Sequence, residues 1–121
     1  MIDYKLQCIG GKPYCFFVCR ERTSVSGVKF SSYSLDWERR DYLKDEDSIT
    51  IPAPKYLKEM LDVAYKIAPD FPFVRIDFYD TDEQLYIGEL TFTPYGNLID
   101  YYKDDFLLKT GNLLKLPQKI K

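Results

Sequence analysis

The sequence predicts an α+β fold that is mainly an antiparallel β-sheet with one principal amphipathic helix packed on it. Strand-like segments flank a Gly- and Pro-containing turn and predict a hairpin over residues 3–20. Apolar side chains at helical spacing predict a helix over residues 54–68. Two apolar runs joined by a short acidic link predict a second hairpin over residues 73–94. The 121 residues are 45% hydrophobic, enough for one core, so we expect a single domain over residues 1–121.

The first hairpin combines an alternating strand with a fully apolar one. In the first arm Tyr4, Leu6 and Cys8 alternate with polar residues, so Lys5 lies on the face opposite to Leu6. That face is either solvent-exposed or a ligand cleft, and a solvated lysine is the simpler interpretation. The second arm contains YCFFVC, which is apolar on both faces and therefore predicts a strand in the sheet interior.

Residues 21–53 are predicted to form a variable loop. Within them SSYSLDW has some strand character. In ERRDYLKDEDS the charges alternate in sign and the apolar residues show little periodicity, which predicts a surface loop. Arginines in this region, such as Arg39 and Arg40, are interleaved with acidic residues, which favours local ion pairs over phosphate contacts. Trp37 is the only tryptophan and is predicted to anchor the loop rather than to bind a ligand.

The predicted helix is bounded by prolines. Pro54 suits the first helical turn, and Pro69 and Pro72 end the helix. The face predicted to enter the core consists of Leu57, Met60, Leu61, Ala64, Ile67 and Ala68. The opposite face is charged and predicts a solvated surface. After the second hairpin, residues 95–121 form a tail with turn signals and further apolar segments.

Composition excludes several functional classes. A net charge of -2 gives no overall attraction to nucleic acid or to an acidic membrane surface. No apolar run reaches the roughly 18 to 20 residues that span a bilayer, and no signal peptide is visible, so we expect an intracellular protein without membrane insertion. The three cysteines lack the spacing of a zinc or redox motif and are expected to be ordinary reduced thiols. Because histidine is absent, any chemistry must use carboxylates, lysine, arginine, tyrosine or a metal.

The second hairpin carries charged side chains where a plain core strand would not need them. Period-two alternation puts Arg75 and Asp77 on one face of the first strand, and Ile87, Glu89 and Thr91 on one face of the second. If the hairpin closes, Asp77 and Glu89 can face each other, and two facing carboxylates require a cation or a basic group beside them. Magnesium shared with a phosphate satisfies this requirement, with Arg75 placed to hold the phosphate. The same pattern also describes a cross-strand salt bridge, which the residue types alone favour.

Several segments resemble a known family. VRIDFY followed by YIGELTFTP resembles the core of the ATP-grasp superfamily, in which two such strands hold the magnesium of Mg-ATP. DYKLQCIGGKP, SYSLDW, PKYLKEMLDVAYKIAPDFPFVRIDFYD, YIGELTFTP and GNLLKLP occur in the same order in the TupA-like ATP-grasp family. The resemblance covers nearly the whole chain. It implies the C-terminal portion of an ATP-grasp domain, in a bacterial cytoplasmic protein of teichuronopeptide or other cell-surface polysaccharide biosynthesis.

The resemblance implies a magnesium site on the second hairpin. Asp77 and Glu89 match the two magnesium-ligating carboxylates of the superfamily. Thr91 stands where many ATP-grasp enzymes have an asparagine ligand, and this departure puts the third protein oxygen in doubt. The cofactors implied are therefore Mg²⁺ and ATP.

The resemblance also implies phosphate contacts from basic residues. Arg75 matches the catalytic arginine that contacts the transferred phosphate in related ligases. Lys5 belongs to the D-Y-K segment, and Arg22 falls near a recurrent arginine of the TupA-like pattern. For both we expect a role in binding the phosphates or the substrate.

The resemblance further implies that the chain carries one side of a nucleotide clasp. It places Met1 partway through the second lobe, so the nucleotide-holding lysine of the preceding lobe is expected from the missing part of the gene or from a second polypeptide. Completed in this way, the protein would be a carboxylate–amine ligase, and alone it is not expected to be catalytic. The alternative is a shortened binding or scaffold module with a structural salt bridge at the former metal site. A homo-oligomer that covers the exposed sheet is also expected.

Overall fold

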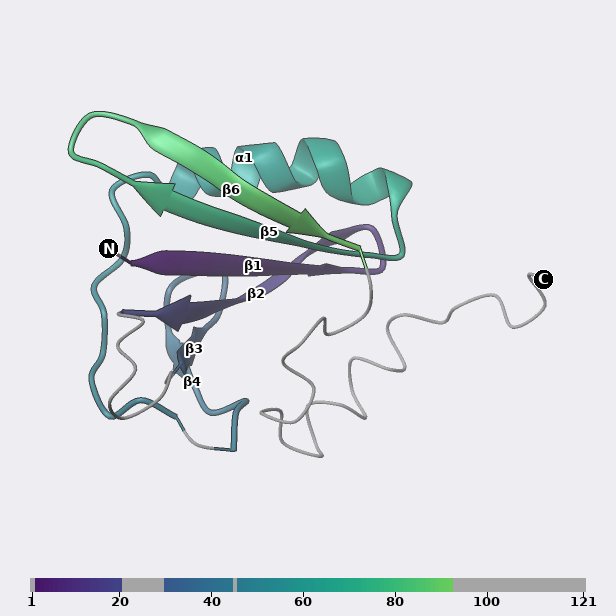
Figure 1. Ribbon diagram of the computed structural model, residues 1–121. Helices are drawn as coiled ribbons and strands as arrows, with labels where there is room; N and C mark the ends of the chain where they lie inside the picture. Colours follow the sequence, from purple (N-terminus) through teal and green to yellow (C-terminus); the bar gives the residue numbers. More distant parts are fainter. Residues whose placement is uncertain (1, 21–29, 45, 93–121) are drawn as a thin grey trace.

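The structure is a computed structural model that describes residues 2–20, 30–44 and 46–92. Within these ranges six strands form one sheet in the order β4-β3-β2-β1-β5-β6, every neighbouring pair is antiparallel, and helix α1 lies on one face (Figure 1). The elements are β1 (Asp3–Ile9), β2 (Lys12–Cys19), β3 (Phe30–Tyr33), β4 (Arg39–Arg40), α1 (Leu57–Ile67), the 3-10 helix η1 (Ala68–Asp70), β5 (Phe73–Asp80) and β6 (Leu85–Thr91). The predicted α+β class is confirmed. No helix in the described ranges is long and apolar enough to cross a membrane.

The first hairpin forms the centre of the sheet. β1 lies between β2 and β5, and the turn from β1 to β2 passes through Gly10 and Gly11 with φ angles of 67° and 88°, a conformation that favours glycine. Phe16 and Phe17 are neighbours on β2 with side chains on opposite faces, and both are 0% exposed. The prediction that this strand is apolar on both faces and lies inside the sheet is confirmed.

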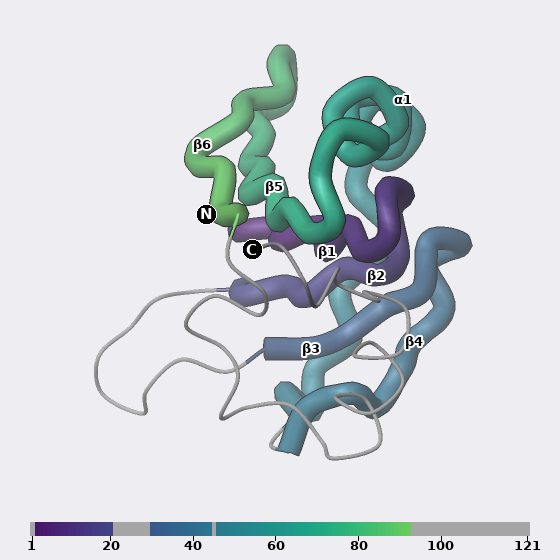
Figure 2. The backbone as a smooth tube through the Cα atoms, turned by 90° about the vertical axis from the view of Figure 1, so that its right-hand side faces the viewer, coloured from purple at the N-terminus to yellow at the C-terminus, as the bar shows by residue number. Residues whose placement is uncertain are grey.

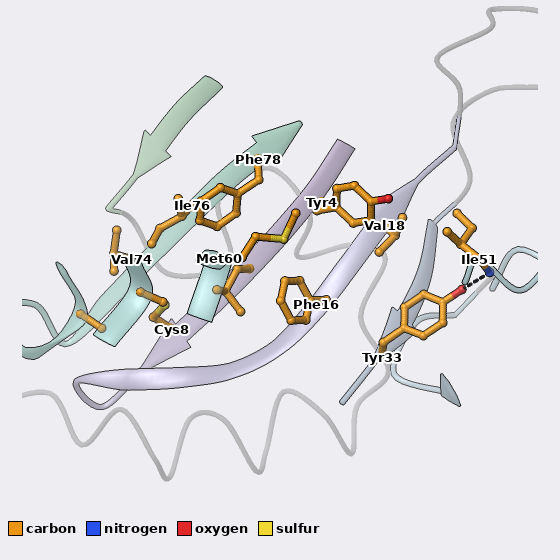
Figure 3. Close-up of a cluster of buried hydrophobic side chains, with 13 residues drawn as sticks. Tyr4, Cys8, Phe16, Val18, Tyr33, Ile51, Met60, Val74, Ile76 and Phe78 are labelled. Carbon is orange, nitrogen blue, oxygen red and sulfur yellow. Dashed lines mark hydrogen bonds between the residues drawn. The ribbon is translucent and has the colours of Figure 1, made fainter. Parts of the chain in front are cut away.

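Helix α1 covers one face of the sheet and creates the larger core. Its buried residues Met60 and Ala64 pack on the strands, and Figure 3 shows the Met60 side chain between Phe16 of β2 and Ile76 of β5. Figure 2, a view at right angles to Figure 1, shows α1 on one side of the sheet. The buried members of this core are Tyr4, Leu6, Cys8, Phe16, Val18, Tyr33, Ile51, Met60, Ala64, Ala68, Val74, Ile76 and Phe78. The other face of the sheet carries a second, smaller buried cluster that includes Phe17 and Leu43.

The helix begins later than the sequence predicts. Its first residue is Leu57, not Pro54, because the chain enters through a turn in which the Leu57 N–H donates to the Pro54 carbonyl at 3.2 Å. Pro69 lies inside η1, so the α-helix ends at Ile67 as the proline required.

The segment predicted as a variable loop contains strands β3 and β4. The prediction of a surface loop after Trp37 was wrong for Leu43, which is 2% exposed and packs in a second cluster with Phe17. The predicted local ion pairs are confirmed for Arg40, which pairs with the interleaved Glu38 at 3.0 Å, and Arg39 pairs with Glu46 at 3.2 Å.

Trp37 anchors this segment, as predicted. Its indole ring stacks on Tyr33 with a centroid distance of 4.4 Å, and its Nε1–H donates to the Ile51 carbonyl at 2.8 Å. The Ile51 N–H in turn donates to the Tyr33 hydroxyl at 2.8 Å, the bond drawn in Figure 3. These contacts tie the segment before α1 to β3.

Candidate functional site

A cluster of polar side chains lies on the face of the sheet that α1 does not cover. Lys5 and Gln7 project from β1, and Arg75 and Asp77 project from β5. The antiparallel register pairs Lys5 with Asp77 and Gln7 with Arg75, so the four residues form two adjacent cross-strand pairs on one face of the sheet. We call these four residues the polar patch. All four are buried, with exposed fractions of 5%, 1%, 7% and 7% for Lys5, Gln7, Arg75 and Asp77.

Asp77 accepts hydrogen bonds from two cations. Its Oδ2 accepts from Lys5 Nζ at 3.0 Å and from Arg75 at 3.2 Å, and its Oδ1 accepts from Arg75 Nε at 2.9 Å. The prediction of a solvated Lys5 was therefore wrong. The partner that Lys5 meets lies 72 residues away in the sequence, so local periodicity could not reveal it.

The neighbouring strand β6 places a second carboxylate opposite the first. Asp77 pairs with Glu89 and Arg75 pairs with Thr91 in the β5–β6 register, so the predicted facing of the two carboxylates is confirmed. Glu89 is exposed, and its carboxylate makes no ion pair or hydrogen bond within the described ranges. Lys5, Arg75, Asp77, Glu89 and Thr91 thus meet on one face of three adjacent strands.

A β-bulge interrupts the alternation of β6 next to this pair. The register shifts between Asp77 and Phe78, so Ile87 pairs with Phe78 and Gly88 is the extra residue. The prediction that Ile87 shares the face of Glu89 was wrong for this reason. A Cβ atom at Gly88 would make an ordinary contact of 3.4 Å with a ring carbon of Tyr79, so space alone does not require glycine at the bulge.

The charges of the cluster do not cancel within its buried part. Lys5 and Arg75 contribute two positive charges and Asp77 one negative charge, which leaves one excess positive charge among side chains that are 5–7% exposed. An unbalanced buried charge is unfavourable unless a further partner compensates it. The exposed carboxylate of Glu89 brings the sum of the four groups to zero. This arrangement is suited to an anionic ligand that arrives together with a cation.

The carboxylates fit a metal that is shared with a ligand better than a metal bound by protein alone. Within the described ranges no group of three or more His, Cys, Asp or Glu side chains could hold a metal ion. Magnesium is commonly held by one or two carboxylates plus phosphate oxygens, and Asp77 and Glu89 supply such a pair. Thr91 lies on the same face of β6 and is the cross-strand partner of Arg75.

The cysteines are not placed for thiol chemistry. Cys8, Cys15 and Cys19 are free and buried, in agreement with the expectation of ordinary reduced thiols. Burial raises the pKa of Cys8 to about 12 and raises that of Cys15 well above its ordinary value. Tyr4 is also no base at neutral pH, because burial, followed by the charges of Asp80 and Tyr33, raises its pKa to about 12.

Arg22 and residues 93–121 lie outside the described residues, so the expectations for them stay predictions. Gln7, the remaining member of the polar patch, was not singled out from the sequence. Period-two alternation does place it beside Lys5 on β1, but its burial and its position opposite Arg75 depend on the pairing of β1 with β5.

The fold is that of a partial ATP-grasp domain, and comparison with known proteins supports an ATP-grasp ligase-like module. Residues 1–115 match the family described as TupA-like ATPgrasp, and the chain belongs to this family. It is also 29% identical over 112 residues to proteins named D-alanine–D-alanine ligase from Helicobacter pylori strains Shi470, HPAG1 and J99. These alignments cover 92% of this chain and 31% of each relative, so the chain spans less than a third of the length of these curated relatives. No solved structure matches the chain.

Proposed function

We propose that this chain supplies the Mg-ATP-binding C-terminal portion of an ATP-grasp ligase. The observation that carries the proposal is the buried group of Lys5, Arg75 and Asp77, with its excess positive charge, beside a second carboxylate on Glu89. A plain salt bridge needs one cation for one carboxylate. Two buried cations around Asp77 provide donors for phosphate oxygens in addition to a metal ligand.

Each residue of the cluster has a proposed role. Asp77 and Glu89 would hold Mg²⁺ with Thr91 nearby, and the bound ion would neutralise phosphate charge. Arg75 is the proposed catalytic residue that contacts the transferred phosphate, and Lys5 is a second phosphate-binding residue. Asp77 would give an oxygen to the metal, and Lys5 and Arg75, which donate to Asp77 in the structure, would then supply donors to the phosphates. Arg22, outside the described residues, remains a proposed contact to phosphate or substrate.

The proposed reaction class is that of a carboxylate–amine ligase, which is in line with the ligase name of the relatives. The other side of the nucleotide clasp would be supplied by the same gene product or by a second polypeptide, and a homo-oligomer is a further proposed partner. Membership of the TupA-like family supports a role in bacterial cell-surface polysaccharide biosynthesis, carried out in the cytoplasm. The carboxylate and amine substrates are not part of the proposal.

Glu89→Gln is expected to abolish Mg-ATP binding, because it removes the charge of one metal ligand. Glu89 is exposed and has no ion-pair partner in the described ranges, so the substitution should leave the fold unchanged. Isothermal titration calorimetry with Mg-ATP should show weak binding to the wild type and none to the variant. Glu83→Gln is the matched control, since Glu83 is an exposed carboxylate in the loop of the same hairpin. Equal heats for wild type, Glu89→Gln and Glu83→Gln would refute the magnesium site.

One observation favours the alternative of a non-catalytic binding or scaffold module. Both oxygens of Asp77 already accept hydrogen bonds from cations, so the structural salt bridge is complete without a ligand. This alternative predicts that the wild type gives no heat with Mg-ATP, while loss of Asp77 still destabilises the fold. The same calorimetric titration therefore separates the two functions.

A further inference from the structure

Gln7 is a buried polar residue whose side chain is not satisfied by its surroundings. It is 1% exposed and lies on β1 between Cys15 of β2 and Arg75 of β5. Its amide nitrogen Nε2 is buried and has no hydrogen-bond partner in the described part of the chain. A buried donor without a partner destabilises a fold, so such a group in a native protein requires an explanation.

The neighbours of Gln7 do not offer a suitable acceptor. Lys5 and Arg75 carry only donors, and the thiol of Cys15 is a weak acceptor. Asp77 is the one carboxylate of the polar patch, and its oxygens already accept from Lys5 and Arg75. The Gln7 amide has two N–H donors in either orientation of its plane. The polar patch therefore contains more donors than acceptors, and a ligand oxygen would correct the imbalance.

We propose that Gln7 is a ligand-binding residue whose Nε2 donates a hydrogen bond to a phosphate oxygen of the bound nucleotide. The proposal rests on the proposed function, because Lys5 and Arg75 must hold the same phosphates. A phosphate group fits the polar patch because it brings several acceptor oxygens and a negative charge to four buried side chains that have surplus donors and, without Glu89, one excess positive charge. Gln7 would thus add a neutral donor to two charged ones.

Gln7→Met tests this role, because methionine has a similar shape and lacks the amide donors. We expect the Mg-ATP dissociation constant to rise about tenfold or more, which is the effect of losing a hydrogen bond to a charged group. The thermal unfolding midpoint of the variant without ligand should be equal to or higher than that of the wild type, since an unsatisfied buried donor has been removed. A loss of Mg-ATP affinity without a loss of thermal stability distinguishes a ligand-binding residue from a structural one.

The control is Leu6→Met. Leu6 immediately precedes Gln7 on β1, and its side chain lies on the opposite face of the sheet, in the core under α1. The Leu6→Met variant should bind Mg-ATP as the wild type does. Gln7→Glu provides a second variant, because it keeps the size and polarity but replaces donors by a negative charge, and it should also bind more weakly. Wild-type affinity in both Gln7 variants, together with loss of binding in Glu89→Gln, would overturn the role of Gln7 alone. Absence of binding to the wild type would instead overturn the proposed function.

Discussion

Replacing Asp77 by alanine is expected to lower the free energy of unfolding by about 3–5 kcal/mol, because it leaves two buried cations without their counter-charge. Lys5 and Arg75 are 5% and 7% exposed, and Asp77 accepts hydrogen bonds from both. Urea denaturation followed by the fluorescence of Trp37, the only tryptophan, measures the change. This loss of stability is expected whether the polar patch is a ligand site or a structural salt bridge. The measurement therefore tests the buried ion pairs themselves.

The ion pair between Lys58 and Asp62 on α1 provides the control. Its side chains are 84% and 58% exposed, and its N–O distance is 3.4 Å. Asp62→Ala should therefore change the free energy of unfolding by less than about 0.5 kcal/mol. If Asp77→Ala costs no more than Asp62→Ala, the polar patch is accessible to water and the charge argument fails.

Phe16→Ala and Phe17→Ala are each expected to destabilise the protein by about 3–5 kcal/mol, the usual cost of removing a buried phenyl ring. Phe16 belongs to the core beneath α1, whereas Phe17 belongs to the cluster on the opposite face, and both are 0% exposed. Equal losses in urea denaturation would show that both faces of β2 are covered.

Tyr65→Ala serves as the comparison for these two variants. Tyr65 is an aromatic residue of α1 that is 56% exposed, so its removal should cost less than about 0.5 kcal/mol. A Phe17→Ala variant that behaves like Tyr65→Ala would mean that the site face of the sheet is open to solvent, contrary to the structure.

The regular elements of the fold could be predicted because their signals are local. Period two predicted the strands of both hairpins, and the double apolar face of Phe16 and Phe17 predicted an interior strand. The first residue of α1 was harder to predict. Pro54 is compatible with the first turn of a helix, but in the structure it belongs to a turn that precedes α1. The burial of Leu43 was missed because it depends on packing against Phe17, which is distant in the sequence.

The candidate site was predictable only where its residues share a strand or a hairpin. Arg75 and Asp77 are two residues apart, and Glu89 follows across one short turn, so alternation and hairpin closure brought them together. Lys5 and Gln7 join the site through the pairing of β1 with β5, a contact between distant segments that neither segment specifies alone. The bulge at Gly88 was likewise invisible to strict alternation.

Asp77 and Glu89 are proposed to hold a metal ion together with nucleotide phosphates. A crystal structure of the full chain with Mn²⁺ and a non-hydrolysable ATP analogue tests this proposal most directly, because anomalous scattering locates Mn²⁺ without ambiguity. We expect a metal peak within about 2.3 Å of carboxylate oxygens of both residues, with phosphate oxygens completing its coordination. A nucleotide or metal bound elsewhere, with Asp77 still hydrogen-bonded only to Lys5 and Arg75, would contradict it.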